Sequence, residues 1–294
     1  MTEFLQSTIY GLLQGGLLAL VAVGFSLVWG VMNVVNLAHG TFVVLGAYVA
    51  WQLNKSAGVD PFLGMFAAAA CLFVAGYAVH MLLINQVIKA PIWMTLLLTF
   101  GLELVLINAM VLVFSGDFRS INTGWAGDAI ALGDVRIPYG RLAGFLVAVG
   151  LTLALVLFMS RTRLGLAIKA TGMDRDAARL MGIPARRVYA TTFAIAAAMA
   201  GAAGAIVGTV GTFSPASAPA FTLQSFVIAV LGGLGNMWGA LAGGLVLGLV
   251  QSWGGQYLSG TLVNALAFGV LVAVLIVRPA GLIGKPYYEA RVET

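Results

Sequence analysis

The strongest constraint on this chain is a long stretch without charge. Residues 188–277 carry no Asp, Glu, Lys or Arg, and residues 142–160 are equally free of charge. A water-soluble domain carries roughly 25% charged residues, whereas this chain of 294 residues is 9% charged and 61% hydrophobic. Such a chain cannot cover a water-facing surface, so we interpret it as an integral membrane protein.

The apolar stretches divide into segments of membrane-spanning length. A transmembrane helix needs about 20 apolar residues, and the candidate segments are 8–30, 34–52, 62–84, 93–114, 141–160, 188–212, 222–252 and 260–277. The segment 222–252 is too long for one simple span and contains Gly232, Gly233 and Gly235. We expect two short helices or a re-entrant hairpin there. The predicted fold is all-α, a polytopic membrane protein of about eight transmembrane helices.

Nearly half of the basic residues lie in one loop. Residues 161–187 hold seven of the 15 Lys and Arg residues, and basic loops between spans stay in the cytoplasm. This loop explains the net charge of +5 more simply than binding to nucleic acid, which we do not expect. Counting back five spans puts the N-terminus outside. The loop 115–140, which mixes charges of both signs, is then periplasmic.

Further basic residues extend this topology. Arg278, Lys285 and Arg291 predict a cytoplasmic C-terminal end, and Lys89 lies in a short turn that is predicted to be inside as well.

The basic loop contains the signals of a short helix. Asp174 is a typical N-cap, Gly182 suits a C-terminal cap and Pro184 prevents continuation. These signals predict a helix over 175–181.

That helix has an apolar face made by Ala177, Leu180 and Met181, while Asp176 and Arg179 are spaced to pair. So short a helix is marginal alone in water. It is therefore expected to pack either on a partner or on the membrane surface.

Three polar residues follow the first span. Asn33, Asn36 and His39 are spaced at i, i+3 and i+6 on a rough helical stripe, which favours a broken helix or a lined pathway. For His39, interhelical hydrogen bonding is favoured over direct contact with a substrate. No metal site is expected, because the other histidine, His80, belongs to another span.

Glu103 is the one acidic residue inside a predicted span. An intramembrane carboxylate is a candidate functional group by default. It could pair with a cation, carry a proton, or remain neutral and hydrogen-bonded.

Glycines recur at four-residue spacing. One series comprises Gly235, Gly239 and Gly243, and a second comprises Gly244 and Gly248. Small residues four apart share a helix face and let backbones approach closely, so they predict helix packing.

Catalytic motifs are missing from the sequence. It has no GxxxxGK[ST], HExxH, CxxC or GxSxG pattern. If the protein uses ATP, another chain must bind it.

Several segments resemble one family. The segments VNLAHGTFVVLGAYVA (35–50), the loop and helix at 162–208, AVLGGLGNMWGALAGGLVLGLV (229–250) and RPAGLIGKP (278–286) resemble LivH-type branched-chain amino acid ABC-transporter permeases. The similarity covers essentially the whole chain.

The resemblance implies one permease domain over 1–294 in the bacterial inner membrane. Such a subunit translocates branched-chain amino acids or related small solutes by alternating access. It pairs with a second, LivM-like permease subunit. Two ATP-binding subunits carry ATP and Mg, so this chain holds no cofactor, and a periplasmic substrate-binding protein delivers the cargo.

The resemblance also assigns a role to the basic loop, as the coupling helix that docks on an ATPase subunit. The residues implied are Gly172, Asp174, Arg175, Ala177, Arg179, Leu180, Met181 and Gly182. Arg175 and Arg179 are expected to be flanking polar contacts.

The sequence departs from the family pattern at two positions. Thr41 replaces the acidic residue that often follows His-Gly, and Glu103 stands where a small or apolar residue is usual. The candidates for lining or gating the substrate path are Asn33, Asn36, His39, Thr41 and Glu103.

Two other functions stay open from the residues. One is a self-sufficient secondary transporter or channel that uses Glu103 as its proton or gating group. The other is a membrane-embedded enzyme, which lacks a motif. The family handles branched-chain and other amino acids, amides, urea and aromatic acids, so the resemblance leaves the cargo open.

Overall fold

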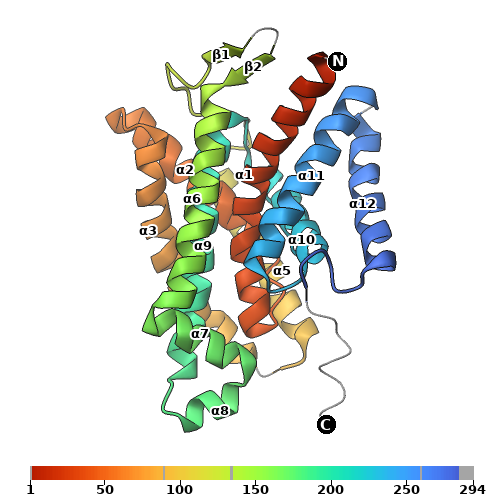
Figure 1. Ribbon diagram of the computed structural model, residues 1–294. Helices are drawn as coiled ribbons and strands as arrows, with labels where there is room; N and C mark the ends of the chain where they lie inside the picture. The colour runs from red at the N-terminus through yellow and green to blue at the C-terminus, as the bar shows by residue number, and fades with distance from the viewer. Residues whose placement is uncertain (1, 89, 133–134, 259, 285–294) are drawn as a thin grey trace.

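The computed structural model describes residues 2–88, 90–132, 135–258 and 260–284 (Figure 1). The helices are α1 (Thr2–Met32), α2 (His39–Ala57), α3 (Pro61–Val79), the π-helix η1 (His80–Ile84), α4 (Asn85–Val87), α5 (Ile92–Phe114), α6 (Tyr139–Arg161), α7 (Arg163–Met173), α8 (Arg175–Leu180), α9 (Ala185–Val210), the 3₁₀-helix η2 (Pro215–Ser217), α10 (Ala218–Gly232), α11 (Met237–Tyr257) and α12 (Gly260–Val277). The strands are β1 (Ala129–Leu132) and β2 (Val135–Pro138).

The observed fold class is the one that the sequence predicted. Six helical segments in the described residues are long and apolar enough to cross a membrane. The all-α polytopic prediction is thus confirmed in outline, whereas the count of about eight spans is not confirmed. The predicted division of 222–252 is correct, because α10 ends at Gly232 and α11 begins at Met237.

The loop 115–140 contains a feature that the all-α prediction missed. β1 and β2 form an antiparallel hairpin, and the Gln6 side chain of α1 exchanges two hydrogen bonds with the backbone of Arg136, at 2.7 and 2.8 Å. The hairpin and the start of α1 therefore share one end of the molecule, and α8 lies at the other end (Figure 1). This arrangement agrees with opposite sides of the membrane for the two loops.

α1 is buried along most of its length and packs most extensively on α11. The contact is a seam of small residues: a Cβ on Gly244 would lie 2.6 Å from the Cβ of Ala19, and one on Gly248 would lie 2.4 Å from the Cα of Gly15. Large side chains are excluded here, so the two backbones come into contact. Gly239 and Gly243 instead face α10, and Gly235 lies in the preceding turn rather than on the helix.

The chain contains the same arrangement twice, in opposite directions. In each copy a long helix is followed by a non-helical return, a second helix that starts inside the bundle, and a third helix. The copies are α1–α2–α3 and α9–α10–α11, with returns at 33–38 and 211–214. α3 packs on α9 as α11 packs on α1, and α2 packs on α9 as α10 packs on α1. This is an inverted repeat.

The first return corrects the predicted start of the second span. α2 begins at His39, not at residue 34, because Asn33 turns the chain with a φ of 51° and the segment 33–38 is not helical. His39 Nε2 lies 2.8 Å from the carbonyl oxygen of Val21, which is about 16 Å before the end of α1 at 1.5 Å per residue. The segment 33–38 therefore runs back into the bundle, and α2 begins there and not at the level where α1 ends.

The turn between α10 and α11 is closed by glycine and by the C-terminal segment. Gly233 and Gly235 have φ of 105° and 81°, conformations that side chains disfavour. The backbone N–H of Leu282 donates to the carbonyl of Leu231 at 2.9 Å. The glycine-rich motif and the C-terminal motif therefore meet. Lys89, Lys285 and Arg291, whose sides of the membrane were predicted, lie outside the described residues.

Candidate functional site

The first return and the start of α2 contact the start of α10. The Thr222 hydroxyl of α10 donates to the carbonyl of Leu37 at 2.8 Å and accepts from the backbone N–H of Gly40 at 2.9 Å. Gly40 is required here, because a Cβ would lie 2.0 Å from the carbonyl oxygen of Ala218. One side chain therefore joins the first turns of two helices from different repeats. We call residues 35–41 and 218–222 the junction.

A second threonine holds the junction from α5. The Thr99 hydroxyl accepts from the N–H of Leu37 and donates to the carbonyl of Val35, both at 3.1 Å. These bonds satisfy backbone groups that the broken helix exposes in an apolar setting. Thr99 and Thr222 were not among the predicted site residues. The available signal was the spacing of Thr95, Thr99 and Glu103 at i, i+4 and i+8.

Glu103 lies on this same inner face of α5. It is 6% exposed, and Thr95 and Thr99 are also buried, while most of the other α5 side chains are exposed or partly exposed. Its Oε1 atom has no hydrogen-bond partner among the described residues. A buried polar atom left without a partner costs about 1–3 kcal/mol, so Glu103 stays a candidate functional group.

The other predicted path residues divide between two places. Asn36, His39 and Thr41 are buried in the junction, and Thr41 donates to the carbonyl of Ala38 at 2.6 Å. His39 makes the interhelical hydrogen bond that was expected of it. Asn36 Oδ1 and His39 Nδ1 have no partners in the described part of the chain. The broken helix that these residues favoured is confirmed, because Asn33 and Asn36 lie in the non-helical return and so form no helical stripe with His39.

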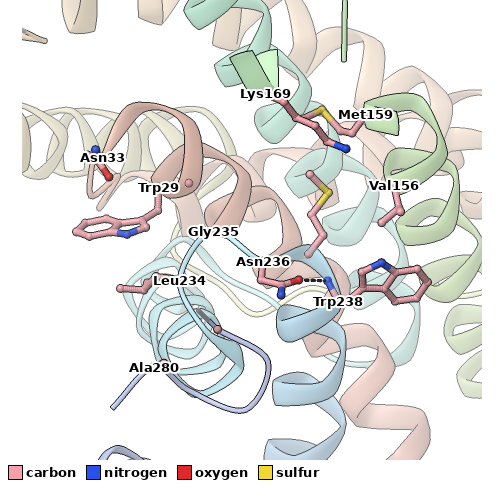
Figure 2. Close-up of a pocket in the computed structure, with 13 residues that line it drawn as sticks. Trp29, Asn33, Val156, Met159, Lys169, Leu234, Gly235, Asn236, Trp238 and Ala280 are labelled. Carbon is pink, nitrogen blue, oxygen red and sulfur yellow. Dashed lines mark hydrogen bonds between the residues drawn. The ribbon is translucent and has the colours of Figure 1, made fainter. Parts of the chain in front are cut away.

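Asn33 belongs to a different site, a cavity of about 580 Å³ near the α8 end of the bundle (Figure 2). Its lining comes from the end of α1, α6, α7, the α10–α11 turn and the C-terminal segment. The residues are Trp29, Gly30, Asn33, Val156, Met159, Lys169, Leu234, Gly235, Asn236, Met237, Trp238, Ala280 and Gly284. Sequence reasoning did not find this cavity, because its walls are distant in sequence.

The described residues contain no group of three His, Cys, Asp or Glu side chains that could hold an ion.

The predicted cap and stop of the short loop helix are confirmed in α8. Asp174 Oδ1 accepts from the N–H groups of Asp176 and Ala177 at 2.8 and 2.9 Å. At the other end Gly182 has a φ of 80°, and Ile183 N–H donates to the carbonyl of Ala178 at 3.0 Å, which completes a Schellman motif. The preceding α7 was not predicted. Gly172 near its end approaches Val31, at the end of α1.

α8 presents an apolar face without a partner in the described residues. Leu180 is 89% and Met181 83% exposed, Ala177 is exposed, and Met173 of α7 adds a further exposed side chain. Ala178 is the buried residue of α8 and faces its own chain.

The two arginines of α8 differ in position. The Arg179 guanidinium lies 3.9 Å from Asp176, as the spacing predicted, on an exposed surface. The Arg175 guanidinium instead lies 5.3 Å from the centre of the Tyr189 ring on α9. Tyr189 is buried, so Arg175 anchors α8 on α9.

Nearly the whole chain is similar to proteins of known function. The model of the family "Branched-chain amino acid transport system / permease component" matches residues 7–276. The chain is 31% identical to the high-affinity branched-chain amino acid transport system permease protein BraD of Pseudomonas aeruginosa, over 98% of both chains. It is 29% identical to LivH of Escherichia coli K12, over 97% of both.

A more distant relative transports a different solute. The fructose import permease protein FrcC of Rhizobium meliloti is 25% identical over 73% of this chain and 61% of its own. No solved structure matches. The family match and the near full-length identity with BraD establish that this multi-pass membrane protein belongs to the branched-chain amino acid transport system permease family.

Proposed function

We propose that the chain is the permease subunit of an ATP-binding-cassette importer that carries branched-chain or related amino acids across the bacterial inner membrane. The observation that supports this most directly is α8, a capped helix of six residues with exposed Leu180 and Met181 at the end of the basic loop. An isolated helix of this length is not stable in water, so contacts with other elements must hold it. α8 is anchored on Tyr189 and exposes an apolar face, which is what we expect of a helix that docks on another subunit.

The importer that we propose has further subunits. A second permease pairs with this chain, two ATP-binding subunits dock on the α8 side, and a periplasmic binding protein delivers the cargo. LivM of Escherichia coli is 26% identical over 90% of this chain, which supports a LivM-like second permease. ATP and Mg belong to the ATP-binding subunits, so this chain provides the path and receives the motion.

The substrate path is assigned to the junction and the inner face of α5. In transporters with inverted repeats, binding sites lie at the repeat interface where helices are interrupted. Here the repeats meet at the Thr222–Gly40 contact, where Asn36 and His39 are buried, and Glu103 lies one helical turn from Thr99, which bonds to Leu37. Their unpartnered atoms offer hydrogen bonds to a polar solute in an otherwise apolar setting. Alternating access would rearrange this contact.

Docking is tested by capturing the ATP-binding subunits on tagged Leu180→Asp permease. We expect capture to fall at least tenfold, because burying an unpaired carboxylate in an apolar contact costs several kcal/mol. Phe118→Asp is the matched control: Phe118 is 73% exposed in the periplasmic loop, and its substitution should leave capture unchanged. Normal capture by Leu180→Asp would refute the assignment of α8.

The energy source and the cargo are tested in proteoliposomes with the complete importer. We expect leucine uptake that requires ATP and the binding protein and that persists after the proton gradient is collapsed. Uptake by the permease alone, driven by a proton gradient, would favour the secondary transporter. Uptake of fructose in place of leucine would move the chain to the cargo class of FrcC.

A further inference from the structure

The cavity beside Lys169 has a position that the transport path does not explain. It opens near the α8 end of the bundle, between the last turns of α1 and α6, the middle of α7 and the α10–α11 turn. Figure 2 shows the Lys169 amine and the Trp238 indole on one side of it, with Trp29 and Asn33 on the other. If the basic loop is cytoplasmic, the cavity lies at the cytoplasmic boundary of the membrane.

Three of the polar side chains in this cavity, those of Lys169, Trp29 and Trp238, are hydrogen-bond donors only. Lys169 has no ion pair in the described part of the chain, where the one ion pair joins Arg179 to Asp176. The indole N–H groups of Trp125 and Trp253 donate hydrogen bonds, whereas those of Trp29 and Trp238 have no acceptor among the described residues. The described lining also contains no Asp or Glu. The available groups therefore complement an anion.

The amide at the centre of the cavity is already engaged. Asn236 Oδ1 accepts from the N–H groups of Trp238 and Gly239 at 3.0 and 3.2 Å, and its Nδ2 donates to the carbonyl of Ile283 at 2.8 Å. Asn236 therefore fixes the turn and contributes little to a ligand. On their side of the cavity, the Lys169 ammonium and the Trp238 indole N–H are left as the groups that can bind an anion.

The remaining wall is apolar and continues onto an exposed surface. Val156 and Met159 line the cavity from α6, and on the same helix Leu153 and Leu157 are 39% and 57% exposed. An ammonium and an indole next to an apolar helix surface match a lipid, whose phosphate and acyl chains lie side by side. A free phosphate ion would use the donors alone and leave the apolar wall without a partner.

We propose that this cavity binds the phosphodiester headgroup of an anionic phospholipid from the cytoplasmic leaflet, such as phosphatidylglycerol. The Lys169 ammonium pairs with the phosphate, and the Trp238 indole N–H donates to the headgroup. An acyl chain follows α6 past Val156. The lipid would fill the gap between α6–α7 and the α10–α11 turn, and so tie α7, which leads into α8, to the membrane surface.

The test is fluorescence quenching of the purified full-length chain by phosphatidylglycerol with brominated acyl chains. The chain has six tryptophans, so Trp238→Phe identifies the share of quenching at the cavity. We expect saturable quenching by brominated phosphatidylglycerol and weaker binding of brominated phosphatidylcholine. Lys169→Gln should weaken phosphatidylglycerol binding by about fivefold, the scale of one lysine at an anionic membrane surface.

Two matched controls test the role of the charge: one keeps it at position 169, and the other removes a charge outside the cavity. Lys169→Arg should retain the affinity, and Arg161→Gln, at the exposed end of α6 outside the cavity lining, should leave it unchanged. Equal affinity for both lipids, or unaltered binding by Lys169→Gln, would overturn the proposal. Inorganic phosphate at constant ionic strength should not relieve the quenching. Displacement by phosphate would assign the cavity to a free anion instead of a lipid.

Discussion

Thr222 bridges the break that precedes α2, since its hydroxyl accepts from Gly40 N–H and donates to the Leu37 carbonyl. Thr222→Val keeps the shape of the side chain but leaves both backbone groups without this partner. We expect a loss of about 1–3 kcal/mol in unfolding free energy, measured by denaturation in detergent. Thr222→Ser retains the hydroxyl and should stay close to the unmodified protein. Equal losses for Val and Ser would show that the methyl group matters more than the bonds.

The seam between α1 and α11 predicts a sharp contrast between two glycines of one helix. Gly244→Ala would place a Cβ 2.6 Å from that of Ala19, so the helices must separate. Overpacking of this kind costs about 1–3 kcal/mol. Gly255→Ala meets no atom within 4 Å and should be neutral or stabilising by about 0.5–1 kcal/mol, because alanine favours a helix. Thermal unfolding of the two variants makes the comparison, and similar melting temperatures would contradict the seam.

The contact of Arg175 with Tyr189 predicts that docking and coupling can be separated. Tyr189→Leu removes the aromatic ring beneath the guanidinium, an interaction of about 0.5–2 kcal/mol, while Leu180 and Met181 remain exposed. We expect the variant to capture ATP-binding subunits but to transport fewer substrate molecules for each ATP hydrolysed.

Tyr189→Phe keeps the ring and is the matched control. The measurement is the ratio of uptake to ATP hydrolysis in proteoliposomes. If the ratio in Tyr189→Leu equals that of the unmodified importer, α9 does not carry motion through this contact.

Glu103→Gln tests the assigned path. The substitution keeps size and hydrogen-bonding capacity but removes the possibility of a carboxylate that binds the ammonium of a passing amino acid. Hydrogen bonds to charged groups contribute about 1.5–3 kcal/mol, so we expect amino acid uptake to fall about tenfold or more with normal expression and melting temperature.

Asn108→Ala, at an exposed position of α5, controls for changes to this helix. Normal uptake by Glu103→Gln would make Glu103 a structural residue of the bundle.

The sequence predicted those features that depend on neighbours along the chain. Hydropathy located the apolar segments, and the order Asp174, Gly182, Pro184 located α8, because caps act within one helical turn. The polar residues before His39 indicated a broken helix as one of two possibilities, but the groups that compensate the break escaped prediction, because they come from Thr99 and Thr222 on distant helices. The Lys169 cavity escaped for the same reason. The spacing of residues along the chain indicates the helix on which a side chain lies, but it does not indicate which other helix that side chain contacts.

The small-residue seam between α1 and α11 also has a consequence for how the protein is made. α1 is synthesised first, whereas the backbone that fits against Gly11, Gly15 and Ala19 belongs to a helix that ends at Tyr257. For most of translation α1 therefore lies in lipid without α11, the helix on which it packs most extensively. The polypeptide can insert span by span, but its core closes only when synthesis is nearly complete, so C-terminal truncation should leave α1 in the membrane without its seam.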